Sequence, residues 1–188
     1  MTQEEKQIAM QSAAPGEQLR VMISKREIDA RLAALAAEIR RDYGDKTVTM
    51  VGALKGSVIF LADLARKIDG PVEFDFIKAS SYGNSCISSG KVLLEMPPSL
   101  DWAEKHILLV EDIIDTGRTL VFLREFIENQ NPASVKICAL LDKPDRREVV
   151  VDYDYIGFTI PDDFVVGYGL DYAQRYRNLP FIGILQFD

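Results

Sequence analysis

The chain of 188 residues is long enough for one domain with a sizeable core, and its content of 47% hydrophobic and 27% charged residues is typical of a soluble globular protein. The formal net charge of −7 argues against a general nucleic-acid-binding surface, because such surfaces are basic. No apolar stretch approaches the roughly 20 residues that a membrane-spanning helix needs. These properties exclude neither an enzyme nor a local basic pocket for a small anion.

The N-terminal sequence MTQEEKQIAM lacks the basic region and the apolar core of a signal peptide. We therefore expect a cytoplasmic protein whose two cysteines, Cys86 and Cys138, are reduced. Cys138 lies in an apolar run and is expected in the core, whereas Cys86 lies in a polar segment. A structural zinc site is not expected, because the chain has one His and two Cys.

Residues 1–18 are polar, lack a helical or strand period and contain a Pro-Gly pair. We expect a flexible tail there and a single domain over residues 19–188. The first predicted helix follows, because Ser24 and Glu27 have the spacing of a capping box and apolar residues recur after them at helical spacing. Gly44 is placed to end this helix.

Beyond this helix, apolar strand-like runs alternate with helical segments. We predict helices over residues 57–68 and 117–129, and strands over residues 47–53, 72–79, 91–96, 106–112 and 135–142. Near-continuous apolar strands that alternate with helices indicate an α/β fold, with a parallel β-sheet flanked by helices on both faces. Three later runs, YIGFTI, FVVGYGL and FIGIL, have turns between them and are expected to form a smaller accessory layer.

The stretch VEDIIDTGRT, residues 110–119, follows directly on the apolar run ILLV. It therefore lies at the carboxyl end of a predicted strand, where open α/β sheets bind ligands. The free N–H groups at the start of the next helix form a site for a phosphate, and Gly117 lets the chain turn tightly there. Thr116 and Thr119 can add hydroxyl donors, and Arg118 can add positive charge.

Three carboxylates, Glu111, Asp112 and Asp115, precede this phosphate loop. A phosphate would repel them, but a carboxylate accepts hydrogen bonds from hydroxyl groups, so Glu111 and Asp112 suit a sugar diol or its Mg²⁺. Asp115 lies nearer the loop and is free to act as an acid or a base. The pattern predicts a phosphorylated sugar held at both ends. The alternative is a strand that ends in an acidic surface loop, which the full run of E-D-x-x-D and T-G-x-T disfavours.

At these residues the sequence resembles the type I phosphoribosyltransferases, and in particular their hypoxanthine and hypoxanthine-guanine branch. Over residues 20–188 the resemblance rests on the order of LKGS (54–57), SSYGN (80–84), VEDIIDTGRT, LLDK (140–143) and DFVVGYGLDY (163–172), followed by Arg177. It implies a small hood formed from the terminal segments beside the main sheet. It also implies transfer of the phosphoribosyl group from 5-phosphoribosyl 1-diphosphate (PRPP) to hypoxanthine or guanine, with Mg²⁺ as cofactor and with IMP or GMP and pyrophosphate as products. Members of the family are homodimers or homotetramers, which we expect here by analogy.

The resemblance implies a role for each matched residue. Asp115 would face the purine N7 as the catalytic base. The 5′-phosphate would be bound by Thr116, Gly117, Arg118 and Thr119, the ribose by Glu111 and Asp112, and the pyrophosphate by Lys55, Gly56, Ser81, Tyr82 and Arg177. The purine would be bound by Lys143, Phe164, Val165 and Asp171, and the metal by Glu111, Asp112 and Asp171. A cis peptide bond is implied between Leu54 and Lys55. Residues 80–90 resemble the loop that closes over the site in this family.

Lys143 gives the expected base preference a physical reason. An ammonium group only donates hydrogen bonds, so it accepts a 6-oxopurine and disfavours the 6-amino group of adenine. Two alternatives remain open: a phosphoribosyltransferase whose main base is xanthine, and a regulatory protein that binds PRPP without catalysis. A regulator could dispense with the catalytic acid, the base-binding lysine and the closing loop, and this chain keeps all three. The segment EMPPSLDWAEK (95–105) matches the family less closely.

Overall fold

The structure is a computed structural model that describes residues 2–81 and 92–187. Its helices are α1 (Gln3–Ser12), α2 (Lys25–Tyr43), α3 (Val58–Ala65) and α4 (Arg118–Glu128), with a 3-10 turn η1 (Pro144–Arg146). Its strands are β1 (Glu17–Ile23), β2 (Val48–Ala53), β3 (Val72–Ser81), β4 (Val92–Met96), β5 (His106–Ile114), β6 (Ser134–Asp142), β7 (Tyr155–Thr159), β8 (Val165–Val166) and β9 (Ile182–Phe187).

The main sheet has the strand order β4-β3-β2-β5-β6-β7 among the described residues. Neighbouring strands from β3 to β7 run parallel, whereas β4 pairs antiparallel with β3 at the edge. The predicted parallel sheet is confirmed. Because parallel strands share one carboxyl edge, the loops after β2, β5 and β6 come together there.

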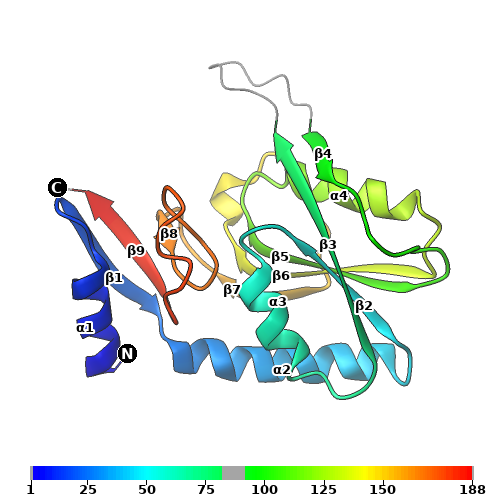
Figure 1. Cartoon of the computed structure of the whole chain (residues 1–188), viewed down its shortest axis with the longest axis horizontal. Helices are drawn as coiled ribbons and strands as arrows, with labels where there is room; N and C mark the ends of the chain where they lie inside the picture. Colours follow the sequence, from blue (N-terminus) through cyan, green and yellow to red (C-terminus); the bar gives the residue numbers. More distant parts are fainter. Residues whose placement is uncertain (1, 82–91, 188) are drawn as a thin grey trace.

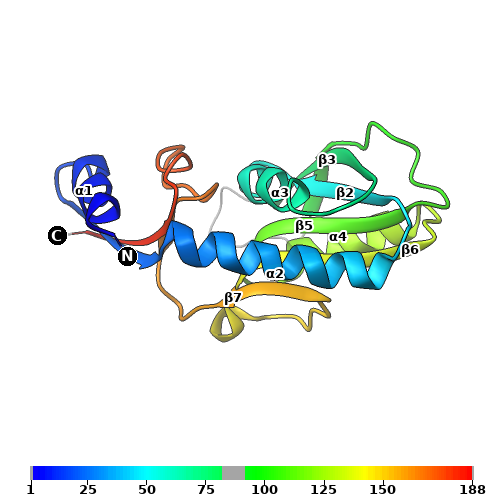
Figure 2. The same ribbon diagram turned by 90° about the horizontal axis from the view of Figure 1, so that it is seen from below.

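Helices cover both faces of this sheet, as predicted. Apolar residues of α2 and α3 pack with Met50 and Leu108 on one face, and those of α4 pack with Val51 and Leu109 on the other. The alternation along β2 and β5 follows from the two-residue period of a strand. The helix α2 runs along the length of the sheet and reaches the second part of the molecule (Figure 2).

That second part is a hood built from both terminal segments, which lie together at one end of the molecule (Figure 1). Its strands have the order β1-β9-β8 and are antiparallel. The expected hood is therefore confirmed. The run YIGFTI was expected in this accessory layer, and that expectation is wrong, because Cys138 of β6 pairs with Tyr155 and β7 extends the main sheet. A short strand pattern cannot reveal which open sheet edge it joins.

The flexible tail predicted over residues 1–18 is also wrong, since α1 and the start of β1 lie there. The side chain of Thr2 accepts a hydrogen bond from the Glu5 N–H at 3.1 Å, and the Glu5 carboxylate accepts from the Thr2 N–H at 2.6 Å, which together form a capping box. The same carboxylate accepts from the Lys25 N–H at 2.8 Å, at the start of α2. Ala9 is buried against the hood sheet. These tertiary contacts stabilise a helix whose own sequence has no clear apolar period.

Other expectations hold. Ser24 and Glu27 form the predicted capping box of α2, and Gly44 follows its last residue. Cys138 is buried in the core, whereas Cys86 lies outside the described residues. Within residues 2–81 and 92–187, no helix is both long and apolar enough to cross a membrane.

Candidate active site

A cavity of about 400 Å³ lies between residues at the carboxyl edge of the main sheet and residues of the hood. Its walls bring together predicted site residues from four separate parts of the sequence, and the lining consists of Asp112, Ile113, Asp115, Lys143, Arg146, Asp162, Phe164, Val165, Leu170 and Asp171. The predicted catalytic residue, the predicted base-binding residues and one predicted ribose-binding residue, Asp112, therefore share one space. Such a mixed polar and apolar pocket at the carboxyl edge is the expected place for a ligand of this fold.

A smaller cavity of about 80 Å³ lies beside the predicted phosphate loop. Its lining includes Glu111, Asp115, Thr116, Gly117 and Thr119. Gly117 has φ +88° and is the N-cap of α4, without a side-chain cap hydrogen bond. The Arg118 N–H makes a long hydrogen bond of 3.4 Å to Thr116 Oγ1, and N–H groups at such a helix start can bind an anion.

Arg118 is arranged differently from its neighbours in the phosphate loop. Its side chain is exposed and its Nε lies 2.7 Å from the Glu148 carboxylate. Its guanidinium is thus already paired with an acidic side chain, and Thr116, Gly117 and Thr119, but not Arg118, line the small cavity.

The loop after β2 contains the implied cis peptide bond between Leu54 and Lys55, which is confirmed. The next residue, Gly56, lies so close to β5 that an added Cβ would be 1.5 Å from Asp112 Oδ2. Gly169 of the hood approaches from the other side, where a Cβ would be 2.0 Å from the Gly56 carbonyl oxygen. Glycine is therefore required at both positions for the close approach of the three segments.

Two predicted pyrophosphate ligands are held beside this loop. Arg177 donates to the Gly169 carbonyl at 2.7 Å and pairs with Asp171 Oδ1 at 2.6 Å. Lys55 donates to the Gln174 side-chain oxygen at 3.2 Å. Both cations thus converge on the junction between the β2 loop and the hood. Ser81 is the last residue of β3, and Tyr82 lies outside the described residues.

Glu111 and Asp112 carry the strongest electrostatic perturbation in the site. Burial raises the pKa of Glu111 well above its usual range, and the neighbouring charge of Asp112 raises it further. Burial also raises the pKa of Asp112 to about 6. Among the described residues, Glu111 Oε2 is a buried side-chain oxygen with no hydrogen-bond partner. Because a buried ionised carboxylate without a partner is costly, this pair is poised to be completed by hydroxyl groups or a cation.

Phe164 is 49% exposed and lines the main cavity, so one face of its ring is accessible to a ligand. The hood fixes the ring, because Tyr172 meets it edge to face at 5.8 Å and the Phe164 carbonyl accepts a hydrogen bond from the Leu185 N–H at 2.9 Å. The next residue, Val165, is buried and also lines the cavity.

Lys143 is 8% exposed, and its Nζ lies 3.7 Å from Asp162 Oδ1. Across the same wall, the Arg146 Nε–H donates to Asp115 Oδ1 at 3.0 Å. The sequence did not single out Arg146 or Asp162. In the pattern DKPDRR an arginine resembles an ordinary solvated charge, and only its place after the carboxyl end of a sheet strand could have marked it.

The comparisons with known proteins agree with this site. Residues 23–173 match the model of the phosphoribosyl transferase domain. The chain is 49% identical over 166 residues to the hypoxanthine phosphoribosyltransferase of Haemophilus influenzae, and the aligned region covers 87% of this chain and 93% of the relative. It is 47% identical over 167 residues to the hypoxanthine-guanine phosphoribosyltransferase of Bacillus subtilis, and the aligned region covers 89% of this chain and 93% of the relative.

Solved structures give the same result. A hypoxanthine-guanine phosphoribosyltransferase from Bacillus anthracis superposes with a TM-score of 0.83 and 45% identity, over 87% of this chain and 96% of that one. A hypoxanthine phosphoribosyltransferase from Staphylococcus aureus superposes with a TM-score of 0.85 and 40% identity, over 89% of this chain and 91% of that one. The chain therefore belongs to the phosphoribosyltransferase family and has its type I fold. Within that family it is similar over most of its length to the hypoxanthine and hypoxanthine-guanine enzymes, as the sequence motifs implied.

Proposed function

We propose that this chain is a purine salvage enzyme that transfers the 5-phosphoribosyl group from PRPP to hypoxanthine, guanine or both, giving IMP or GMP and pyrophosphate. The observation that carries this proposal is the single cavity in which Asp115, Lys143 and Phe164 lie beside the phosphate loop. The similarity to enzymes of this activity over at least 87% of the chain supports the reaction class.

The phosphoribosyl part of the substrate would be held at both ends. The backbone N–H groups and the hydroxyls of residues 116–119 would bind the 5′-phosphate. Glu111 and Asp112 would accept hydrogen bonds from the ribose hydroxyls, which would supply the partner that Glu111 Oε2 lacks among the described residues. Lys55, the Gly56 amide and Arg177 would hold the pyrophosphate, together with Ser81 and Tyr82.

The purine would occupy the main cavity. Its 6-oxygen would accept a hydrogen bond from Lys143, which is mostly buried and can only donate. Its ring would stack on the accessible face of Phe164. The backbone of Val165 and the segment at Asp171 would contact the opposite edge of the base.

In the reaction, the bond between ribose C1 and the pyrophosphate oxygen breaks and a bond from C1 to purine N9 forms. Positive charge develops at C1, as in glycoside chemistry. The purine must lose one proton, and Asp115 would accept it from N7 and later release it to solvent. In the reverse direction, the protonated Asp115 would return the proton as N9 leaves.

Mg²⁺ fits this site only together with the substrate. No group of three or more His, Cys, Asp or Glu side chains among the described residues could hold a metal alone. Magnesium in phosphate-transfer sites is commonly bound by one or two carboxylates together with substrate oxygens. The unpartnered oxygen of Glu111, with Asp112 and Asp171, supplies such carboxylates. When bound, the ion would neutralise negative charge on the leaving pyrophosphate.

Nucleotide formation from PRPP tests the proposal directly. The purified protein is incubated with PRPP and Mg²⁺ and offered hypoxanthine, guanine, xanthine, adenine or uracil in parallel, while pyrophosphate and nucleotide are measured. We expect turnover with hypoxanthine and guanine and little with adenine or uracil. Main activity with xanthine would favour the alternative base. PRPP binding without turnover of any base would contradict the enzyme and favour a PRPP-binding regulator.

The assembly and the compartment are also proposals. We propose a homodimer or homotetramer that acts in the cytoplasm, by analogy with the family. Size-exclusion chromatography with light scattering tests the assembly, and a monomer at working concentration would contradict it.

A further inference from the structure

Four charged side chains form a connected cluster on one wall of the main cavity. Arg146 Nε donates to Asp115 Oδ1 at 3.0 Å and lies 3.7 Å from Asp162 Oδ1. The same Asp162 oxygen lies 3.7 Å from Lys143 Nζ. The cluster therefore alternates carboxylate and cation, from the proposed catalytic base to the proposed reader of the purine 6-oxygen. Each of these residues lines the cavity.

The backbone places Arg146 where it can make this contact. The turn η1 begins with Pro144 and is closed by a hydrogen bond from the Arg146 N–H to the Lys143 carbonyl at 3.1 Å. The next residue, Arg147, donates from NH1 to the Asp115 carbonyl at 2.7 Å and also pairs with the Asp142 carboxylate. The loop after β6 is thus fixed against the loop after β5, and the Arg146 side chain is directed over Asp115.

We propose that Arg146 is a positioning residue for Asp115: its Nε–H holds one carboxylate oxygen and leaves the other to receive the proton from purine N7. Asp162 Oδ1 lies 3.7 Å from the same Arg146 nitrogen and adds a second negative charge beside the guanidinium. This inference rests on the proposed function, in which Asp115 is the proton acceptor. A carboxylate with one oxygen fixed presents the other in a defined direction, which favours a productive geometry before the purine binds.

The contact contributes to orientation more than to folding. The side chains of Arg146 and Asp115 are 49% and 44% exposed, and ion pairs at such exposure add little stability. A neutral substitution of similar length is therefore expected to fold normally. A loss of rate in such a variant would come from the reacting group and not from the scaffold.

The test is a double-mutant cycle with Arg146→Met and Asp115→Asn, measured as single-turnover formation of IMP with enzyme in excess over hypoxanthine. We expect Arg146→Met to slow the reaction about 10-fold, and Asp115→Asn about 100-fold or more, since general bases contribute on that scale. In the Asp115→Asn background, Arg146→Met should cost no further rate, because the side chain that Arg146 orients can no longer accept the proton. The KM for PRPP should stay unchanged in Arg146→Met.

Arg124→Met is the matched control, because Arg124 pairs with Glu128 on the exposed face of α4, away from the main cavity. Wild-type rates in Arg146→Met, or losses that multiply in the double variant, would overturn the proposal. A raised KM for PRPP at an unchanged rate would also overturn it, since Arg146 would then bind the anionic substrate itself. Absence of IMP formation by the wild-type protein would instead refute the proposed function, so the two failures are distinguishable.

Discussion

At the carboxyl end of β5, Asp112 has a raised pKa of about 6, and burial is the main cause. A carboxyl group with a raised pKa in the folded state stabilises the fold at low pH, and this contribution is lost as pH rises through the folded value. At pH 8 the Asp112 carboxylate of the empty protein is therefore ionised and partly removed from water, which destabilises the fold. A bound ligand would offset this destabilisation.

Asp112→Asn should therefore stabilise the empty protein at pH 8 by up to about 3 kcal/mol, because the pKa is raised from its ordinary value to about 6 and each pKa unit corresponds to about 1.4 kcal/mol. The amide oxygen can still accept the Ile113 N–H, so the backbone geometry is kept. The advantage should shrink as pH falls below about 6, and turnover should be lost. Urea unfolding at pH 5 and pH 8, without Mg²⁺ or PRPP, measures this. A variant less stable than wild type at pH 8 would contradict it.

Lys143 makes a prediction about base preference. Lys143→Met should lower kcat/KM for hypoxanthine about 10- to 100-fold, because a hydrogen bond from a charged group contributes about 1.5–3 kcal/mol. The KM for PRPP should change little. Steady-state kinetics with hypoxanthine and adenine measure both effects, with Lys67→Met on the exposed surface as the control. If the ratio of kcat/KM for hypoxanthine to kcat/KM for adenine were unchanged, a role of Lys143 in base recognition would be contradicted.

The sequence identified residues of the site where a motif has a chemical reason, as in the phosphate loop and the acidic pair before it. It did not identify Arg146 or Asp162, because their meaning depends on a contact between the loops after β5 and β6. The spacing of these residues along the sequence does not predict this contact. The paired state of Arg118 was missed for the same reason, since Glu148 lies thirty residues further along the chain.

At the scale of secondary-structure elements, the alternating strands and helices were predictable because their apolar periods are clear. The helix α1 was not predictable in this way, because it is stabilised by a capping box and by the Glu5 carboxylate, which also accepts a hydrogen bond at the start of α2. The position of β7 was not predictable either, because strand order is set by which edge of the sheet is open. The antiparallel direction of β4 follows from its return along β3 and has no signal in its own composition.

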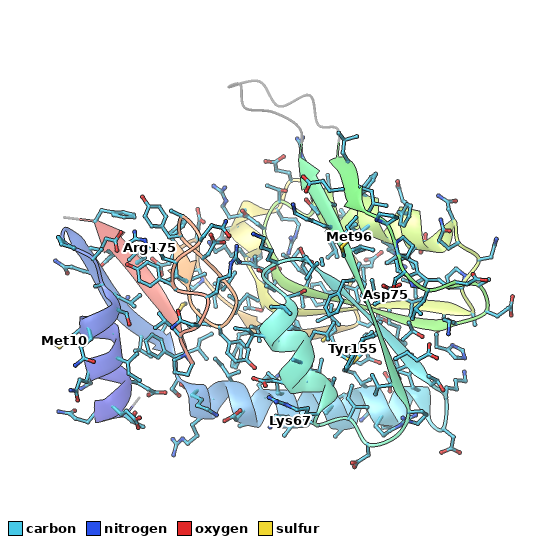
Figure 3. All side chains as sticks on the ribbon, viewed as in Figure 1. Met10, Lys67, Asp75, Met96, Tyr155 and Arg175 are labelled. Atoms are coloured by element: carbon cyan, nitrogen blue, oxygen red, sulfur yellow. The ribbon has the colours of Figure 1, made fainter. Side chains whose placement is uncertain are left out.

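Asp75 of β3, which is labelled in Figure 3, accepts hydrogen bonds from the segment between β4 and β5, where the sequence matches the family less closely. Its buried carboxylate accepts hydrogen bonds from four residues: Phe76, Ser99, Leu100 and Trp102. Burial by itself raises the pKa of Asp75, but hydrogen bonds from Leu100, Ser99 and Phe76 outweigh it and lower the pKa below its usual value. This gives Trp102 a structural role.

Asp75→Asn should therefore destabilise the fold by about 2–3 kcal/mol, because an amide cannot accept from all these donors and leaves buried groups unpaired. The destabilisation should shrink below about pH 4, where the wild-type carboxylate also begins to lose its folded-state advantage. Unfolding followed by the fluorescence of Trp102, the one tryptophan of the chain, measures it. Asp101→Asn, at an exposed position, is the control. Equal stability of Asp75→Asn and wild type would contradict this account.

At the scale of the whole molecule, the site exists only where two parts meet. The main sheet contributes the proposed phosphate loop, the acidic pair and Lys143, whereas the hood contributes Phe164, Val165 and Asp171. The two parts are joined by the larger apolar core, which continues from α2 and α3 into the hood through Val165 and Ile184. A ligand bound between them is therefore expected to touch both parts.

A crystal structure of the protein with IMP bound tests the central claim most directly. The account predicts the 5′-phosphate on the N–H groups of residues 116–119, the 6-oxygen within hydrogen-bonding distance of Lys143 Nζ, and N7 facing the Asp115 carboxylate. It further predicts the purine ring stacked on Phe164. A phosphate bound elsewhere, or a base whose 6-oxygen points away from Lys143, would contradict it.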